Sequence, residues 1–198
     1  IRACTMHANG SLKEAKTLHE QGLANKRVAL ADSHPSVADS LLSLGHVLLD
    51  LGFLEEAQRR YESVVEMRLE YYLPESAPVA EGRHYVAKVL RIRGRLNEAE
   101  ACLREVLADK MKLKEENMIG DFWIAQTQFE LGEVTRDLLR LDEARIFYSG
   151  ALATYRKCLG DQPHPQLALI FLALADVARR VGRLDDAEAV MKRGVDTL

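Results

Sequence analysis

The stretch LGFLEEA, at residues 51–57, decides the fold because variants of it recur along the whole chain. The variants read NGSLKEA at 9–15, RGRLNEA at 93–99, LLRLDEA at 138–144 and VGRLDDA at 181–187. Their final alanines are 42, 42, 45 and 43 residues apart, at Ala15, Ala57, Ala99, Ala144 and Ala187. A fixed period in the range of roughly 20–50 residues indicates a repeat architecture. The sequence therefore predicts stacked copies of one structural unit.

Other positions follow the same period at helical spacing. In each full repeat a small residue stands twelve positions before the alanine, at Gly45, Ala87, Gly132 and Ala175. Larger side chains stand four positions after the alanine, at Tyr61, Leu103, Tyr148 and Met191. Intervals of three and four predict two helices per repeat, A and B, whose axes approach closely at the small residues. The recurring phrase is then the hinge between them, with a glycine for the turn and acidic residues at the start of helix B.

The predicted fold is all-α, with four full repeats of two helices each and a partial repeat before them. The A helices are expected near 36–51, 77–93, 121–138 and 165–181. The B helices are expected near 12–30, 54–72, 96–116, 141–159 and 184–197, and residues 1–8 are expected to end an earlier helix A. Pro35, Pro78 and Pro165 suit first helical turns, and Asp121 is expected as the cap of the third full repeat.

The whole chain, 1–198, is predicted to form one solenoid. Its partial repeat covers 1–33, and the full repeats cover about 34–75, 76–117, 118–162 and 163–198. Because the pattern continues to both ends and the chain begins at Ile1, we expect an excerpt of a longer protein.

The composition favours a cytoplasmic protein. The chain is 47% hydrophobic and 29% charged, with a net charge of −3, which argues against nucleic-acid binding because phosphate recognition usually needs a basic surplus. The three cysteines are scattered, as expected of free thiols in a reducing compartment. No signal peptide is visible, and the longest apolar run, 167–175, is about half of a bilayer span, so no membrane insertion is expected.

No motif for chemistry is present. The sequence lacks a glycine-rich phosphate loop, an HExxH motif, a nucleophile elbow and a Cys/His metal spacing. The six histidines are scattered, and a metal pair of His46 and His84 is disfavoured. We therefore expect no enzyme activity, no cofactor and no metal.

The repeat pattern resembles the tetratricopeptide repeat. The period of about 42 residues, against about 34 in the common form, makes residues 34–68 and 157–193 similar to the long repeats of kinesin light chains. The resemblance implies a right-handed α-α superhelix, and an adaptor whose A helices line a concave groove that binds a peptide or helix. Kinesin light chain repeats typically carry an Asn pair in helix A, where this chain reads Leu42–Ser43, His84–Tyr85, Phe129–Glu130 and Leu172–Ala173. The carboxylate clamp of chaperone-binding repeats is also missing.

Counting back from the alanines gives three rows of groove-facing positions, which we take as the candidate partner-binding site. The first row is Leu42, His84, Phe129 and Leu172, to which Leu169 is added. The second row is His46, Lys88, Glu133 and Asp176. The third row is Leu49, Arg91, Arg136 and Arg179.

The first and third rows each have two interpretations. The first row either accepts apolar side chains of a partner or packs on neighbouring A helices. The arginines of the third row either pair with an acidic partner or are neutralised by Asp50, Glu133 and Asp137, which is the favoured interpretation. Trp123 is an exposed contact or, preferably, is partly buried. Leu139 replaces the hinge glycine, so that turn has a different geometry or is strained by about 1 kcal/mol.

The sequence thus predicts a protein-interaction scaffold that binds a partner peptide or helix with acidic and apolar residues. The alternative is a structural spacer or self-associating module in a cytoskeletal, ciliary or signalling assembly, which leaves homo-oligomerisation open.

Overall fold

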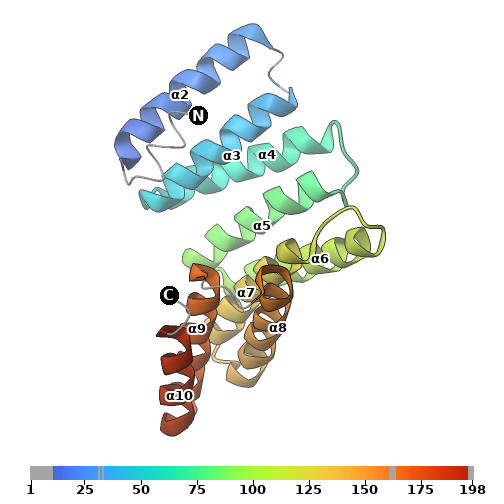
Figure 1. Cartoon of the computed structure of the whole chain (residues 1–198). Helices are drawn as coiled ribbons and strands as arrows, with labels where there is room; N and C mark the ends of the chain where they lie inside the picture. The colour runs from blue at the N-terminus through green and yellow to red at the C-terminus, as the bar shows by residue number, and fades with distance from the viewer. Residues whose placement is uncertain (1–10, 31, 33, 161–163, 196–198) are drawn as a thin grey trace. The chain divides into compact units, whose positions relative to one another are not determined.

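The computed structural model describes residues 11–30, 32, 34–160 and 164–195, and all regular elements within them are helices (Figure 1). The expected helix end at 1–8 lies outside this range. The helices are α2 (Leu12–Ala29), α3 (Pro35–Asp50), α4 (Leu54–Leu69), α5 (Ala77–Ile92), α6 (Leu96–Glu115), α7 (Asp121–Asp137), α8 (Leu141–Leu159), α9 (Pro165–Arg180) and α10 (Leu184–Val195). The all-α prediction is confirmed. The odd-numbered helices are the A helices, and the even-numbered helices are the B helices.

The chain divides into two compact units, Ile1–Arg95 and Leu96–Leu198. In the first unit α3 packs against α2 and α4, and α4 packs against α5. In the second unit α7 packs against α6 and α8, while α9 packs against α8 and α10. Consecutive helices therefore pack as antiparallel neighbours within each unit, as the alternation of A and B helices requires.

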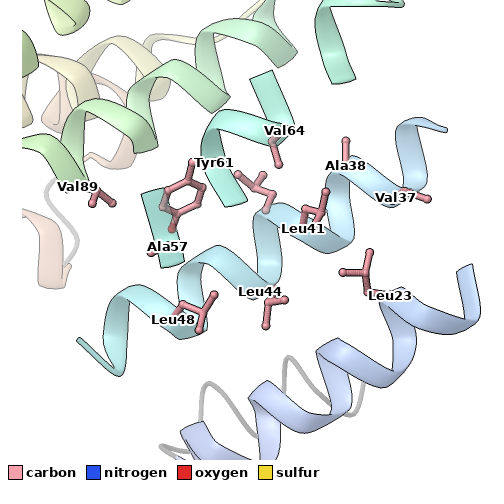
Figure 2. Close-up of a cluster of buried hydrophobic side chains, with 11 residues drawn as sticks. Leu23, Val37, Ala38, Leu41, Leu44, Leu48, Ala57, Tyr61, Val64 and Val89 are labelled. Atoms are coloured by element: carbon pink, nitrogen blue, oxygen red, sulfur yellow. The ribbon is translucent and has the colours of Figure 1, made fainter. Parts of the chain in front are cut away.

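Each unit has its own apolar core. In the first unit the core joins four successive helices and includes Leu23 of α2, Leu41 and Leu44 of α3, Tyr61 and Val64 of α4, and Val89 of α5 (Figure 2). The second core includes Ala144, Tyr148 and Ala151 of α8 with Leu167 and Ile170 of α9. The repeat alanines are buried in these cores, as their predicted role in close helix packing requires.

The four hinges share one hydrogen-bond pattern. At the first hinge the N–H of Gly52 donates to Leu49 O, and the N–H of Phe53 donates to Leu48 O. This is a Schellman motif, which requires a positive φ at the residue after the helix cap. Gly52 has φ +79°, whereas Leu139 meets the same requirement with φ +62° and the same bonds. The sequence left open whether this hinge changes its geometry or keeps it under strain. The structure shows the unchanged geometry, with the strain at Leu139.

In the first three B helices, α2, α4 and α6, a cation stands eleven positions after the repeat alanine and joins helix B to the next helix A. Lys26 Nζ donates to Ser36 O at 3.0 Å and to Ser40 Oγ at 2.7 Å. Lys110 Nζ, in the second unit, donates to Trp123 O at 3.3 Å and to Thr127 Oγ1 at 2.9 Å. These partners occupy equivalent positions of their repeats. The two ammoniums thus add a hydrogen bond to a first-turn carbonyl of the following A helix and join that helix to the preceding helix B.

Arg68 occupies the same position on α4 and makes more contacts. Its Nη1 donates to Pro78 O at 2.5 Å and to Glu81 Oε2 at 2.9 Å, both on α5. Its Nη2 lies 3.2 Å from Asp39 Oδ1 on α3. This buried guanidinium therefore holds three helices together, because its fork of donors reaches several acceptors at once.

The structure shows which residues cap the starts of α3, α7 and α9. His34 and His164 each accept a hydrogen bond through Nδ1 from the backbone N–H two residues later, so both cap the A helices that their prolines begin. The expected cap at Asp121 is wrong, because Gly120 occupies the cap position and Asp121 is the first helical residue. The Asp121 carboxylate instead contacts Lys114 and Lys157, which lower its pKa.

No helix in the part of the chain that the structure describes is both long and apolar enough to cross a membrane.

Candidate functional site

The first predicted row differs sharply between the two units. Leu42 and His84, in the first unit, are buried, and only 8% of Leu42 is exposed. In the second unit Phe129 is half-buried, while Leu172 is 47% exposed and its neighbour Leu169 is 52% exposed. The row is therefore accessible to a partner on α9 and largely covered on α3 and α5.

The A-helix side of the first unit carries an aromatic cluster. His46 Nδ1 on α3 lies 2.8 Å from the hydroxyl of Tyr61 on α4. The ring of Tyr85 on α5 stands edge-on to His46 at 4.4 Å and stacks on Tyr61 at 5.4 Å. Burial raises the pKa of Tyr61, and Tyr85 adds to this effect, so the Tyr61 hydroxyl stays neutral. The cluster leaves His46 and Tyr85 half-buried at this surface.

The remaining predicted residues of the first unit, Leu49, Lys88 and Arg91, are half-buried. Leu49 packs against the apolar core. These three side chains therefore offer only part of their surface to a partner.

On α7, the positions that correspond to His46 and Leu49 of α3 are occupied by Glu133 and Arg136, which belong to a network of charged side chains. The hydroxyl of Tyr148 donates to Glu133 Oε1 at 2.7 Å. The guanidinium of Arg136 donates to both oxygens of Glu133, at 2.8 and 3.0 Å, and to Asp137 Oδ1 at 3.0 Å. Burial alone would lower the pKa of Arg136, but the surrounding acidic groups raise it overall. Arg136 is therefore already paired within its own helix.

On α9, one carboxylate serves two arginines. Asp176 Oδ1 lies 2.7 Å from Arg179 Nη2, and its Oδ2 lies 2.7 Å from Arg180 Nε. Burial would raise the pKa of Asp176, but the two guanidiniums lower it overall. Because two cations share one anion, the end of α9 keeps one unit of positive charge beside the exposed Leu172.

The structure thus brings Leu169, Leu172, Asp176 and Arg179 together on one face of α9, with intervals of three and four residues. Phe129, Glu133 and Arg136 share the matching face of α7, which contacts α9. We call the exposed face of these two helices the α7/α9 face. It combines two accessible leucines with a mixed set of charges.

Two features were missed in the sequence, one in the site and one between the repeats. Tyr85 lies in the centre of the aromatic cluster, although nothing but its aromatic side chain beside His84 distinguishes it. The cations Lys26, Arg68 and Lys110 are 42 residues apart, so the repeat period alone indicates them. Trp123 is partly exposed, and the Lys110 ammonium lies 5.6 Å from the centre of its ring.

Within the described ranges no group of three or more His, Cys, Asp or Glu side chains is arranged to hold a metal ion.

Comparison with known proteins agrees with this geometry. A sequence model of the tetratricopeptide repeat family matches residues 36–111 and 123–198. The curated relatives include two Arabidopsis thaliana proteins, KINESIN LIGHT CHAIN-RELATED 1, 22% identical over 93% of this chain, and KINESIN LIGHT CHAIN-RELATED 2, 24% identical over 91%. The chain spans only 29% and 26% of the length of these two relatives.

Solved structures show the same fold. A putative kinesin light chain of P. anserina with nearly identical repeats superposes with a TM-score of 0.75 at 23% identity, over 98% of this chain and 90% of that one. BtubC from P. vanneervenii gives a TM-score of 0.77 at 22% identity, over 98% and 76% of the two chains. A Rap protein complexed with competence and sporulation factor gives 0.85 at 14% identity, over 99% and 51%.

Proposed function

Because this chain belongs to the tetratricopeptide repeat family, we propose that it is a non-enzymatic scaffold that binds a peptide or helix of a partner protein on its A-helix side. Such domains are generally protein-interaction scaffolds, and the repeats here are of the kinesin light chain type. The Rap protein, which has the same fold, is complexed with competence and sporulation factor, and this supports a binding role for a solenoid of this kind. The finer proposal is that the α7/α9 face is the docking surface.

The exposure of Leu169 and Leu172 is the observation that carries this proposal. They are 52% and 47% exposed and lie one helical turn apart. Leu42, the counterpart of Leu172 in the first full repeat, is only 8% exposed. Fully burying an exposed leucine is worth about 1.5–3 kcal/mol, and roughly half of that remains to be gained at each of these half-exposed side chains, so a partner with apolar side chains gains affinity here. Helix-in-groove recognition uses apolar anchors that lie one helical turn apart on the partner helix.

The charges beside the leucines indicate the chemistry of the partner. Arg179 is mostly exposed and shares Asp176 with Arg180, which leaves a local positive charge. Arg179 follows Leu172 by seven residues, or about two helical turns, and an acidic group of the partner at that distance beyond its apolar anchors would pair with it. On α7, Arg136 is already paired with Glu133 and Asp137, so it contributes less to binding an acidic group.

We further propose a cytoplasmic adaptor role with association to the cytoskeleton, supported by the similarity to kinesin light chain-related proteins. A nucleic-acid partner is not part of the proposal, since the chain carries a net charge of −3. The second candidate is a structural spacer that associates with itself, which the exposed aliphatic side chains on the B helices favour.

A displayed library of random peptides, selected on the immobilised chain, tests the docking surface. Clones captured by the native chain are measured again on the double variant Leu169→Asp/Leu172→Asp. The matched control is Leu184→Asp, which places the same charge on α10 at a leucine that is 66% exposed. We expect binding to be lost with the double variant and kept with the control. Clones that bind all three proteins equally would contradict the proposal.

A further inference from the structure

A second surface lies on the B-helix side of the second unit. A cleft of about 360 Å³ runs between α8 and α10, and α9 forms its floor. The floor is aliphatic and includes Leu174, Val177 and Val181. Ala178, also in the floor, follows Leu169 by nine residues, which is about two and a half helical turns. The cleft therefore lies on the side of α9 opposite the α7/α9 face.

The walls of this cleft carry four charged side chains in a particular order. The α8 wall presents Asp142 and then Arg145, whereas the opposite wall presents Arg183, in the hinge just before α10, and then Asp186 of α10. Because α8 and α10 both pack against α9 and run in the same direction (Figure 1), the order of acid and base along one wall is the reverse of the order along the other. Within the described part of the chain, none of the four makes an ion pair or a side-chain hydrogen bond. By contrast, Glu143 on the other flank of α8 pairs with Arg104 of α6.

We propose that this cleft is a self-association site that docks on the same cleft of a second copy of the chain. Two unpaired acids and two unpaired bases give the rim no net charge, so it has no long-range attraction for a polyanion or a strongly acidic peptide. A two-fold interface requires a patch that is complementary to itself. The reversed order of charges on the two walls meets this requirement, because each Arg of one copy can face an Asp of the other.

Ile146 supplies the projection that such an interface needs. It is 63% exposed and lies four residues after Asp142 and three before Ser149, both of which line the cleft. At this spacing it stands on the ridge of α8 beside the opening. In the proposed dimer, Ile146 of each copy enters the cleft of the other copy and covers Val181, which is half-exposed at the edge of the floor. Burial of these aliphatic groups drives association, and the four charges fix its orientation.

Sedimentation velocity of the 198-residue chain, over a series of concentrations, measures this association directly. We expect a reversible dimer whose dissociation constant rises at least about tenfold in Ile146→Asp. Ala189→Trp, which fills the cleft from its α10 wall, should have the same effect. The control Leu184→Asp adds the same charge on α10 and should dimerise like the native chain. Far-UV circular dichroism verifies that each variant is folded.

Exchanging the charges of Arg145 and Asp186 distinguishes a dimer formed through this cleft from a dimer formed through another surface. Arg145→Asp alone and Asp186→Arg alone should each weaken the dimer, and the double variant Arg145→Asp/Asp186→Arg should restore it. A native chain that stays monomeric throughout would assign the cleft to a different occupant and overturn the proposal. A dimer unaffected by Ile146→Asp, or a double variant no better than the single ones, would overturn it as well. Peptide capture by the α7/α9 face is a separate readout, so either proposal can fail without the other.

Discussion

The backbone of Gly132 lies so close to the ring of Tyr148 that a Cβ atom on the glycine would be 2.6 Å from two ring carbons. Gly45 and Tyr61 have the same relationship in the first unit, with 2.5 Å to the nearest ring carbon. In both repeats the close approach carries the tyrosine hydroxyl to the A-helix surface, where it meets Glu133 or His46. The glycine in helix A and the tyrosine in helix B therefore act as one packing unit.

Gly132→Ala should destabilise the chain, because the new Cβ has no room beside a rigid ring. Overpacking of this kind typically costs about 1–3 kcal/mol, which exceeds the gain of about 1 kcal/mol in helix propensity. Gly22→Ala is the control, since a Cβ there meets nothing within 4 Å in the middle of α2. We expect Gly132→Ala to lower the midpoint of chemical denaturation and Gly22→Ala to raise it. Equal shifts in both variants would contradict the packing argument.

Leu139→Gly should stabilise the chain by about 1 kcal/mol, because it removes the cost of a positive φ at a residue with a Cβ. Gly182→Leu, at φ +84° in the last hinge, should produce a loss of similar size. Since Leu139 is largely exposed, its replacement removes little apolar packing. Thermal unfolding followed by circular dichroism gives the direction of both changes. A lower melting temperature for Leu139→Gly would show that the leucine side chain outweighs the backbone strain.

Lys110→Met should weaken the contact between α6 and α7. The ammonium is buried and donates to Trp123 O and Thr127 Oγ1, so its loss leaves two acceptors without this donor. Hydrogen bonds to charged groups contribute about 1.5–3 kcal/mol, which sets the expected loss. A double-mutant cycle with Thr127→Val measures the interaction free energy between the Lys110 and Thr127 side chains. Additive losses in the cycle would mean that the two side chains act independently.

Glu100 gives the stability a defined acid dependence. Its carboxylate bonds to Arg140 and also to Arg104, and these bonds lower its pKa below the ordinary 4.5. Because the folded pKa is the lower one, the stabilisation is fully present above about pH 4.5 and is lost as the pH falls through the folded value.

Glu100→Gln should therefore reduce stability at neutral pH by about 1 kcal/mol, a modest value since both arginines are partly exposed. Below the folded pKa the variant and the native chain should converge. Urea denaturation at a series of pH values checks this, with Glu105→Gln, an exposed residue of the same helix, as the control. A difference that stays constant down to strongly acid pH would contradict the assignment.

The sequence predicted the helices closely because local residues mark each helix boundary, and similar residues recur at the same boundary in the other repeats. The range expected near 54–72 is observed as Leu54–Leu69, and the range near 121–138 as Asp121–Asp137. The strained hinge at Leu139 was one of two stated alternatives, since one sequence does not reveal whether a turn keeps its geometry without glycine.

The accessibility of the candidate site was not predictable in the same way. Leu42 and Leu172 occupy the same position of their repeats, but one is buried and the other is 47% exposed. The difference depends on which neighbouring side chains cover each position, such as the aromatic cluster of His46 and Tyr85, and the repeat spacing carries no information about that. The cleft between α8 and α10 likewise depends on the separation of two helices that are distant in the sequence.

The most direct test of the proposed function is photo-crosslinking with a peptide selected on the native chain. A photoreactive phenylalanine analogue replaces Leu172 on α9 in one protein and Leu184 on α10 in another, both of them exposed leucines. We expect a covalent adduct with the peptide at position 172, competed by unlabelled peptide, and none at position 184. An adduct at 184 without one at 172 would contradict the assignment of partner binding to the α7/α9 face.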